Sequence, residues 1–255
     1  MIGETRIAVV VPACDEAVWI AETLRALPEY VDHVVVVDDG SRDATAAIVA
    51  GMSDTRVELV RHARNLGVGA ALRTGYAHAF AAGAEVVAVM AGDGQMHADD
   101  LAVLLAPVLA GEADYAKGDR LSHALARGTM PFARWVGNHL LSGLTRWTTG
   151  LSVRDSQCGY TVLARRAAER VALAELWGGY GYPNDLLGRL AQARARVRDV
   201  VVRPVYRGEA SGIGWRHALV VIPCVLLRVL ARRVAAALGS QSDRLPDAPS
   251  CALES

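Results

Sequence analysis

The fold class is decided by Val86-Val87-Ala88-Val89-Met90-Ala91-Gly92-Asp93-Gly94-Gln95. Five apolar residues run directly into a short acidic loop, which is the pattern of a buried strand that ends at the edge of a sheet. The loop brings the Asp93 carboxylate and the Gln95 carboxamide to the carboxyl end of the strand, where ligands bind in open α/β sheets. Its glycines let the backbone approach a ligand closely. On this stretch alone, an ordinary turn from a strand to a helix is the simpler interpretation.

Strand and helix patterns alternate around this stretch. Apolar runs predict strands at residues 6–11, 33–37, 57–60, 85–90 and 113–117. Apolar residues at helical spacing predict helices at residues 17–27, 43–50, 67–81 and 98–109. This alternation indicates right-handed β-α-β units, and hence an α/β fold with a mostly parallel sheet covered by helices on both faces.

The pattern changes after Gly118. Further elements are expected as helices at 131–147 and 182–194, a strand or loop and strand at 153–163, a strand at 196–206, and an amphipathic helical region at 212–238. Pro223 is expected to kink or split that last region.

We expect one domain over residues 1–238, with a first half (1–118) and a second half (119–238). The tail, 239–255, is rich in Ser, Pro and Asp and is expected to be disordered.

The composition excludes several classes of function. Lys and Arg number 27, as do Asp and Glu, so the bulk charge does not indicate a nucleic-acid binder. The four cysteines have no CxxC spacing, which favours a reduced, cytoplasmic setting over a zinc site or a disulfide framework. The N-terminus does not resemble a signal peptide. The longest uncharged apolar run, 218–227, is far shorter than the roughly 20 residues of a membrane-spanning helix.

Two acidic segments follow predicted neighbouring strands. They are Pro12-Ala13-Cys14-Asp15-Glu16 and Asp38-Asp39-Gly40-Ser41. Their side chains can accept hydrogen bonds from a nucleobase edge or from ribose hydroxyls. Turn formation or helix capping explains Asp38, Ser41 and Asp43 equally well, with Ser41 or Asp43 as the expected N-cap, but explains Asp39 less well.

Four motifs in register carry a family resemblance. They are Val-Val-Pro-Ala-Cys-Asp-Glu-Ala (10–17), Val-Val-Asp-Asp-Gly-Ser-Arg-Asp-Ala-Thr (36–45), Arg-Asn-Leu-Gly-Val-Gly-Ala-Ala (64–71) and Asp-Ser-Gln-Cys-Gly-Tyr (155–160). Over residues 6 to about 235 the chain resembles the inverting glycosyltransferases of family 2, which have the GT-A fold. Within that family it is most similar to the dolichol-phosphate mannose synthase and polyprenyl-phosphate glycosyltransferase group.

The resemblance implies a nucleoside-diphosphate sugar, UDP- or GDP-hexose, as the donor. Asp39 would bind the nucleoside, and Pro12, Ala13 and Glu16 would line the base pocket. The full set of expected donor-binding residues is Pro12, Ala13, Asp15, Glu16, Asp38, Asp39, Gly40, Ser41, Asn65, Gly67, Asp93, Gly94 and Gln95. Gly67 and Gly69 at a helix start can present N–H groups to phosphate, although close packing of the helix on the sheet is slightly favoured.

The resemblance also implies a divalent cation, with one departure from the family pattern. The usual Asp-x-Asp is Ala91-Gly92-Asp93 here. Mg²⁺ needs only one or two carboxylates besides substrate phosphates and water. Asp93 with Gln95 therefore remains a candidate site for Mg²⁺ or Mn²⁺, with weak affinity before the donor binds. The alternative is a nucleotide-sugar-binding pseudoenzyme that has lost catalysis with the missing aspartate.

Asp155 is, with Asp93, the expected catalytic residue. By resemblance it is the carboxylate at the reacting end, a general base for a hydroxyl acceptor. A lipid-phosphate acceptor is already an anion, so Asp155 would then orient groups or act electrostatically. The alternative is a structural ion pair with Arg154 or another arginine.

The acceptor side is expected to contain Arg120, Arg134, Asn138 and Gln157. Guanidinium groups are suited to clamping a phosphate, although arginines on a solvated helix face are common. Asn138 stands where relatives often have Ser. For Asn184-Asp185, at the start of a predicted helix, capping is the safer interpretation.

The region 212–238 combines apolar residues with Arg228, Arg232 and Arg233. This pattern fits a helix that lies on a membrane surface and, equally well, a core-packed helix with a basic outer face. The expected function is transfer of a hexose, with inversion, to a polyprenyl phosphate at the cytoplasmic membrane face. A soluble glycan or a small-molecule aglycone is the alternative acceptor.

Overall fold

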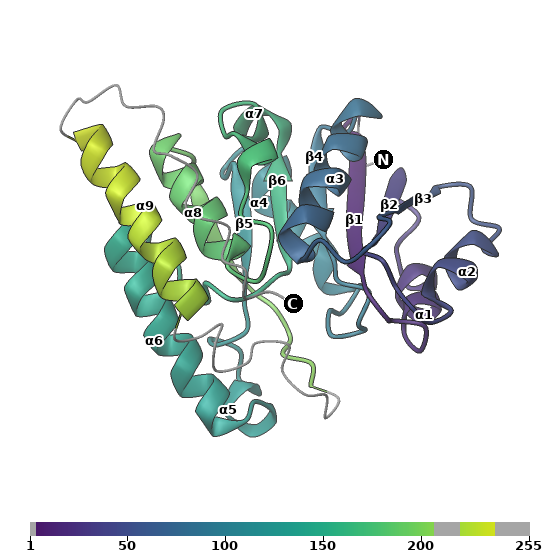
Figure 1. Cartoon of the computed structure of the whole chain (residues 1–255), viewed down its shortest axis with the longest axis horizontal. Helices are drawn as coiled ribbons and strands as arrows, with labels where there is room; N and C mark the ends of the chain where they lie inside the picture. Colours follow the sequence, from purple (N-terminus) through teal and green to yellow (C-terminus); the bar gives the residue numbers. More distant parts are fainter. Residues whose placement is uncertain (1–3, 207–219, 238–255) are drawn as a thin grey trace.

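The computed structural model describes residues 4–206 and 220–237. Within them, the strands form one sheet in the order β3-β2-β1-β4-β6-β5-β7 (Figure 1). The strands are β1 (Ile7–Ala13), β2 (His33–Asp38), β3 (Val57–Arg61), β4 (Val86–Val89), β5 (Tyr115–Asp119), β6 (Thr161–Ala164) and β7 (Val197–Val201). All neighbouring pairs are parallel except those of β6, which runs antiparallel to both β4 and β5.

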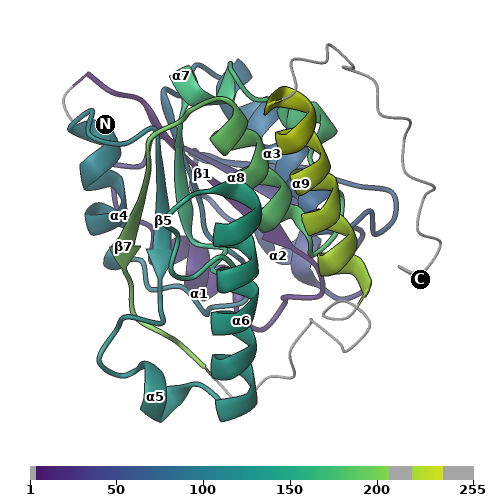
Figure 2. The same cartoon turned by 90° about the vertical axis from the view of Figure 1, so that its left-hand side faces the viewer.

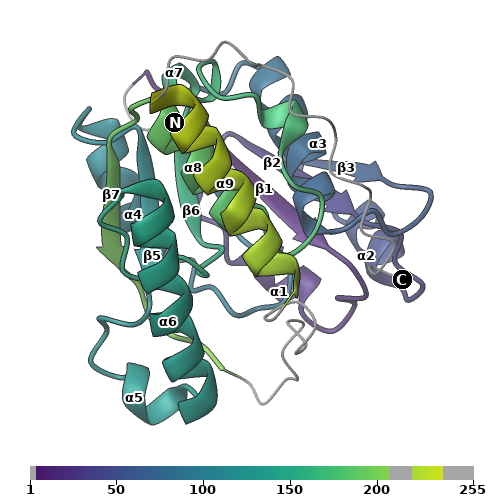
Figure 3. The same ribbon diagram turned by 60° about the vertical axis from the view of Figure 1, so that its left-hand side comes forward.

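Helices cover both faces of the sheet. They are α1 (Ile20–Arg25), α2 (Thr45–Ala50), α3 (Val68–Ala81), α4 (Asp100–Leu109), α5 (Ala126–Thr129), α6 (Phe132–Thr149), α7 (Arg165–Ala168), α8 (Tyr182–Gln192) and α9 (Ile222–Ala237), with a short 3₁₀ turn at Leu173–Glu175. Residues of α1, α2 and α4 share one core with the sheet, and residues of α3, α7 and α8 share the other. Outside α8 lie α6 and α9, side by side (Figures 2 and 3).

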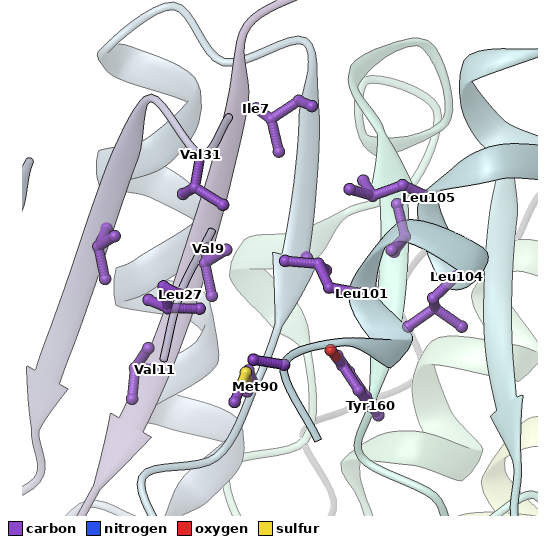
Figure 4. Packing of buried hydrophobic residues seen from close by; sticks show 14 of the residues in the cluster. Ile7, Val9, Val11, Leu27, Val31, Met90, Leu101, Leu104, Leu105 and Tyr160 are labelled. Carbon is purple, nitrogen blue, oxygen red and sulfur yellow. The ribbon is translucent and has the colours of Figure 1, made fainter. Parts of the chain in front are cut away.

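The valine-rich strands explain this two-sided burial. Alternate residues of a strand point to opposite faces, so Ile7, Val9 and Val11 of β1 enter one core and Ala8 and Val10 enter the other. Figure 4 shows the first core, in which the β1 side chains and Met90 lie across from leucines of α4. A strand that is buried on both faces needs a continuous apolar run, which is the pattern that the sequence carries.

The strand register brings the acidic loops together. Ala13 pairs with Asp38, and Val10 pairs with Val89. Because β1, β2 and β4 are parallel, the segments that follow them leave the sheet at the same edge. The Asp93 loop therefore lies beside the loop after β1.

The α/β class, the mostly parallel sheet and its helical cover are confirmed. The antiparallel direction of β6 was not predicted, and the strand expected over 196–206 ends at Val201. Pro223 lies in the first turn of α9, directly after a π-helical turn at Val220 and Val221. Whether it kinks the wider region 212–238 stays a prediction, since residues 212–219 are not described. The expected boundary at residue 118 falls inside β5. Residues 212–219 and the predicted tail, 239–255, lie outside the described residues.

Among the described helices, none has the length and apolarity required to cross a bilayer.

Candidate active site

A cavity of about 340 Å³ lies at the edge of the sheet where the loops after β1, β2 and β4 meet. Many of the expected site residues line it: Pro12, Ala13, Glu16, Asp39, Asn65, Gly67, Asp93, Gln95, Arg120 and Gln157. Others do not lie on its wall: Asp15, Asp38, Gly40, Ser41, Gly94, Arg134, Asn138 and Asp155. The fold thus collects side chains from all four sequence motifs around one space.

Asp39 is buried, and its carboxylate holds the segment that leads into α3. It accepts hydrogen bonds from the backbone N–H groups of Leu66 (2.9 Å) and Gly67 (2.8 Å). His62 Nδ1 lies 2.6 Å from Asp39 Oδ1, and His62 Nε2 lies 3.0 Å from Thr74 Oγ1. His62 therefore fixes Asp39 at the cavity wall. Sequence reasoning missed His62, whose only signal is its place directly after a strand beside the Asp38-Asp39 turn.

Asp15 joins the loop after β1 to the loop after β2, and Asp38 holds the start of the loop after β2. Asp15, at a left-handed φ of 58°, accepts the N–H of Arg42 at 2.7 Å, and Ser41 Oγ accepts the N–H of Asp15 at 3.0 Å. Asp38 Oδ1 accepts the N–H of Ser41 at 3.1 Å, and its Oδ2 pairs with Arg61. These contacts support the turn interpretation for Asp38 and Ser41.

The expected N-cap of α2 was wrong. The cap position is Ala44, one residue after Asp43, and it makes no capping contact with its side chain. Asp43 still bonds to the first turn of the helix, since its Oδ1 accepts both the N–H of Thr45 (2.9 Å) and the Thr45 hydroxyl (2.5 Å).

Three glycines allow close backbone contacts around the start of α3. A Cβ on Gly69 would lie 1.9 Å from the Trp177 carbonyl oxygen, and one on Gly40, at φ 72°, would lie 2.5 Å from the backbone at Arg64. Gly67 has a φ of 93°. The N–H of Ala70 donates to the Gly178 carbonyl at 2.9 Å. Gly67 and Gly69 are therefore closely packed, but against the backbone at residues 177–179 and not against the sheet, as the sequence had slightly favoured.

Asp93 and Gln95 face the cavity from the loop after β4. Asp93 Oδ1 accepts the N–H of Gln95 at 2.9 Å, and Gly94, at φ 68°, packs next to Trp19. Within the described part of the chain, no three His, Cys, Asp or Glu side chains gather into a metal-binding group. One carboxylate and one carboxamide fit a divalent cation that takes its remaining ligands from donor phosphates and water.

Asp155 is fully buried and bound to Arg120. Its Oδ2 accepts hydrogen bonds from Arg120 Nε (2.8 Å) and from the backbone N–H of Arg120 (3.2 Å). Its Oδ1 accepts hydrogen bonds from Arg120 Nη2 (3.1 Å) and from the backbone N–H of Gln157 (3.2 Å). Burial by itself would raise the pKa of Asp155, but the Arg120 guanidinium outweighs it and holds that pKa below the usual range. The structural ion pair foreseen as an alternative is present, with Arg120 in place of Arg154.

A buried lysine lies beside this pair. The Lys117 ammonium donates to the Cys158 carbonyl, and burial lowers its pKa. Sequence reasoning placed Lys117 at the end of the predicted strand 113–117 and gave it no role.

The expected acceptor residues separate into two groups. Arg120 and Gln157 line the cavity, and the Arg134 guanidinium lies 5.2 Å from the centre of the Tyr206 ring. Burial raises the pKa of Tyr206, while the charges of Arg120 and Arg134 act in the opposite direction. Asn138 is buried, and its amide lies 3.7 Å from Met130 Sδ.

Asn184 and Asp185 do not cap α8, whose cap position is Gly181. They are buried and bond to neighbouring elements instead, so the capping interpretation was wrong. Asn184 Oδ1 accepts the Thr145 hydroxyl at 2.8 Å. Asp185 accepts the N–H of Trp177 and pairs with Arg189 and with Arg232 of α9.

Tyrosines and cysteines complete the cavity wall, and sequence reasoning did not single them out. They are Tyr160, Tyr180, Tyr182, Cys14 and Cys158. Burial raises the pKa of Tyr180, and the nearby Cys14, Glu16 and Asp93 raise it further. Tyr180 thus shares the cavity wall with Cys14, Glu16 and Asp93. The glycine-rich, aromatic sequence 177–182 was its only signal.

An open α/β sheet with these motifs around one cavity defines the class: the protein is a glycosyltransferase. More particularly, it belongs to glycosyl transferase family 2, whose sequence profile matches residues 8–172.

Named relatives and a solved structure agree with this assignment. The UDP-N-acetylglucosamine–dolichyl-phosphate N-acetylglucosaminyltransferase of Methanococcus voltae is 30% identical over 231 residues, which cover 82% of this chain and 92% of that protein. The polyprenol monophosphomannose synthase of Mycolicibacterium smegmatis is 29% identical, with 73% of each chain covered. The solved structure is that of glucosyl-3-phosphoglycerate synthase of Mycobacterium tuberculosis in complex with Mn²⁺, UDP-glucose and phosphoglyceric acid. It has a TM-score of 0.66 at 22% sequence identity, and the match covers 89% of this chain and 80% of that chain. This likeness shows the GT-A fold.

Proposed function

We propose that this enzyme transfers a hexose, with inversion, from a nucleoside-diphosphate sugar to a polyprenyl phosphate. The two relatives named for dolichyl and polyprenol phosphate products support the acceptor class. UDP is the favoured nucleotide, since one of those relatives and the structural neighbour are both named with UDP-sugars. Such an acceptor would place the enzyme at the cytoplasmic face of a membrane.

One observation carries the choice of an anionic acceptor: the Asp155 carboxylate is fully engaged by Arg120 and Gln157. A general base needs an oxygen that can reach the proton it removes and a pKa near the working pH. Asp155 is buried, accepts four hydrogen bonds and has a lowered pKa. It is therefore poorly suited to deprotonating a hydroxyl. A phosphate nucleophile requires no base, and an arginine held in place can bind it.

In this arrangement, each group of residues has a separate task. The nucleoside would bind beside Asp39, and Asp93 with Gln95 would hold a divalent cation at the diphosphate. The cation supplies Lewis-acid neutralisation of the charge on the leaving diphosphate. Arg120, together with Arg134, which lies against the Tyr206 ring, would orient the acceptor phosphate. The phosphate would attack the sugar carbon from the side opposite the leaving diphosphate, which gives inversion.

Calorimetry and an acceptor panel test this proposal. Purified protein is titrated with UDP-, GDP- and dTDP-hexoses, with and without Mn²⁺, and we expect metal-dependent binding of one nucleotide class. Transfer is then assayed with a polyprenyl phosphate, 3-phosphoglycerate, a soluble glycan and an uncharged aglycone. Preference for an uncharged hydroxyl acceptor would contradict the proposal. Donor binding with neither transfer nor hydrolysis would instead indicate a protein that has lost catalysis.

A further inference from the structure

The solvent face of α6 carries a stripe of large apolar side chains. Phe132, Leu140, Leu144 and Trp147 are 78%, 65%, 47% and 67% exposed. With the half-buried Val136 they recur every three or four residues, so they lie along one side of the helix. The opposite side, which includes Asn138, Ser142 and Thr145, is buried against the rest of the protein. The helix thus turns polar residues inward and apolar residues outward, the reverse of an ordinary surface helix.

A second stripe lies on α9. Val220, two residues before the helix begins, is 38% exposed, and Leu227 and Val234 within the helix are 65% and 48% exposed. The three lie at intervals of seven residues. The exposed Cys224 and Ala231 fall between them. Exposure of these apolar side chains to water is unfavourable, and soluble monomers rarely present large apolar patches.

The two stripes belong to one surface, which we call the α6–α9 face. The helices lie side by side on the same side of the sheet, outside α8 (Figures 1 and 3). Arg233 Nη1 donates to the Trp147 and Thr148 carbonyls, and Arg232 pairs with Asp185 of α8. Val225 and Val229 pack on Gly181 and Gly188 of the α8 region. All these contacts lie on the inner side of α9 and fix the helix there. Its outer side is left beside that of α6.

The charge around the α6–α9 face has one sign. Residues 120–154 and 220–237 contain no Asp or Glu. Arginines in the two helices are Arg134, Arg146, Arg228, Arg232 and Arg233. A second copy of this chain would bring like charges together, which opposes self-association. Arg232 and Arg233 are bonded inward, and Arg146 Nη1 donates to the Val153 carbonyl. An anionic bilayer surface therefore offers an apolar layer for the stripes and phosphates chiefly for Arg134 and Arg228.

The position of the face also fits the active site. The Arg134 guanidinium of α6 lies 5.2 Å from the centre of the Tyr206 ring, and Val205, the residue before Tyr206, lines the cavity together with Arg120. A phosphate at the bilayer surface beside α6 would therefore lie close to the acceptor side of the cavity.

We propose that the α6–α9 face docks this protein on an anionic bilayer, with Phe132, Leu140, Leu144, Trp147 and Leu227 inserted at the level of the headgroups. The surface expected from the sequence was 212–238 alone; the larger stripe is on α6. This inference deepens the proposed function, but vesicle binding can be measured without donor or acceptor, so each can fail separately.

Co-sedimentation with vesicles tests the docking. The full chain is mixed with phosphatidylcholine vesicles with and without phosphatidylglycerol, at low and high salt. We expect binding that requires phosphatidylglycerol and weakens with salt. The variant Leu140→Gln/Leu144→Gln/Trp147→Gln should reduce the bound fraction at least about fivefold, and Leu227→Gln should reduce it further. Val18→Gln/Val103→Gln is the matched control, because both valines are exposed, at 78% and 55%, away from α6 and α9.

Three results would overturn the docking proposal. They are no binding of the wild type to anionic vesicles at low salt, unchanged binding of the α6 variant, and a wild-type dimer in sedimentation that the α6 variant converts to monomer. Circular dichroism and donor calorimetry on each variant verify the fold. If vesicle binding behaves as expected but no lipid-linked sugar forms, the proposed function fails and the docking surface stands.

Discussion

At the scale of single residues, the Asp155–Arg120 pair determines which chemistry the site can perform. The Asp155 carboxylate is removed from solvent and occupied by four donors, while the Arg120 side chain keeps 21% of its surface exposed at the cavity. Buried pairs of this kind hold a charge in a defined orientation more than they add stability. We therefore interpret Asp155 as a positioning residue that acts through Arg120.

Asp155→Asn should lower the melting temperature and reduce transfer at least about 100-fold, because breaking a buried pair costs about 3–5 kcal/mol. Arg120→Lys keeps the positive charge but loses the planar guanidinium. It should reduce transfer by a similar factor, mainly through a higher KM for the acceptor. The double variant should be little worse than either single variant, since one unit is broken in each case. Donor affinity by calorimetry serves as the control. A loss confined to kcat, with an acid limb that disappears from the pH profile, would show that Asp155 is a base.

The missing second carboxylate of the metal loop gives a gain-of-function prediction. Ala91 lines the cavity two residues before Asp93, so Ala91→Asp should add an oxygen ligand. We expect the Mn²⁺ concentration for half-maximal transfer to fall by about tenfold, because hard cations bind more tightly as carboxylates are added. Asp93→Ala should abolish transfer. Full activity of Asp93→Ala without metal would refute the assigned metal site.

At the scale of elements, the contact between α3 and the 177–183 segment holds two walls of the cavity together. Gly67 and Gly69 approach the backbone at residues 177–179, and Tyr180 follows directly. A side chain at Gly69 has no space there, since its Cβ would meet the Trp177 carbonyl oxygen at 1.9 Å.

Gly69→Ala should therefore destabilise the fold by about 1–3 kcal/mol and weaken donor binding. Gly137→Ala in α6 is the matched control, because a Cβ there meets nothing within 4 Å. That control should stabilise the helix by about 0.5–1 kcal/mol. Urea unfolding measures both variants, and equal stabilities would contradict the assigned contact.

The β5–β7 pair carries a pH-dependent element. Asp199 pairs in register with Lys117, and burial, followed by the neighbouring charge of Asp119, raises the pKa of Asp199 to about 6. The folded state then binds a proton that the unfolded chain, with an aspartate pKa of about 3.9, has released. Stability is thus highest below about pH 4 for this group and falls as the pH rises to about 6.

Asp199→Asn should remove that dependence. Its melting temperature should exceed that of the wild type at pH 7.5, and the difference should shrink toward pH 4.5. The N–H of Arg154, which donates to Asp199 Oδ2 at 2.8 Å, can still donate to the amide oxygen. A constant difference at both pH values would contradict the raised pKa.

The elements differ in how far the sequence determines them. The buried strands before Asp38 and Ala91 were predictable because two-sided burial requires an uninterrupted apolar run. The antiparallel β6 was not, since its four residues, Thr161–Ala164, look the same in either direction. Likewise, the partner of Asp155 lies 35 residues away, directly after the end of β5, and no local pattern distinguishes Arg120 from Arg154. Ala91, in contrast, was visible at once as a departure from the family motif.

At the scale of the whole molecule, the donor side, the acceptor side and the α6–α9 face follow one another around the sheet. The acidic loops after β1, β2 and β4 form one wall of the cavity, and Arg120 after β5 forms another. Arg134 and Tyr206 continue from there to α6. This order matches the path that a sugar would follow from a soluble nucleotide to a lipid at a surface.

The most direct measurement is the structure of the product. The enzyme is incubated with Mn²⁺, UDP-[¹³C]hexose and a polyprenyl phosphate in vesicles, and the organic extract is examined by NMR. The account predicts a sugar joined through phosphate to the lipid, with the anomeric configuration opposite to that of the donor. Retained configuration, or label found only on a soluble acceptor that is also supplied, would contradict it.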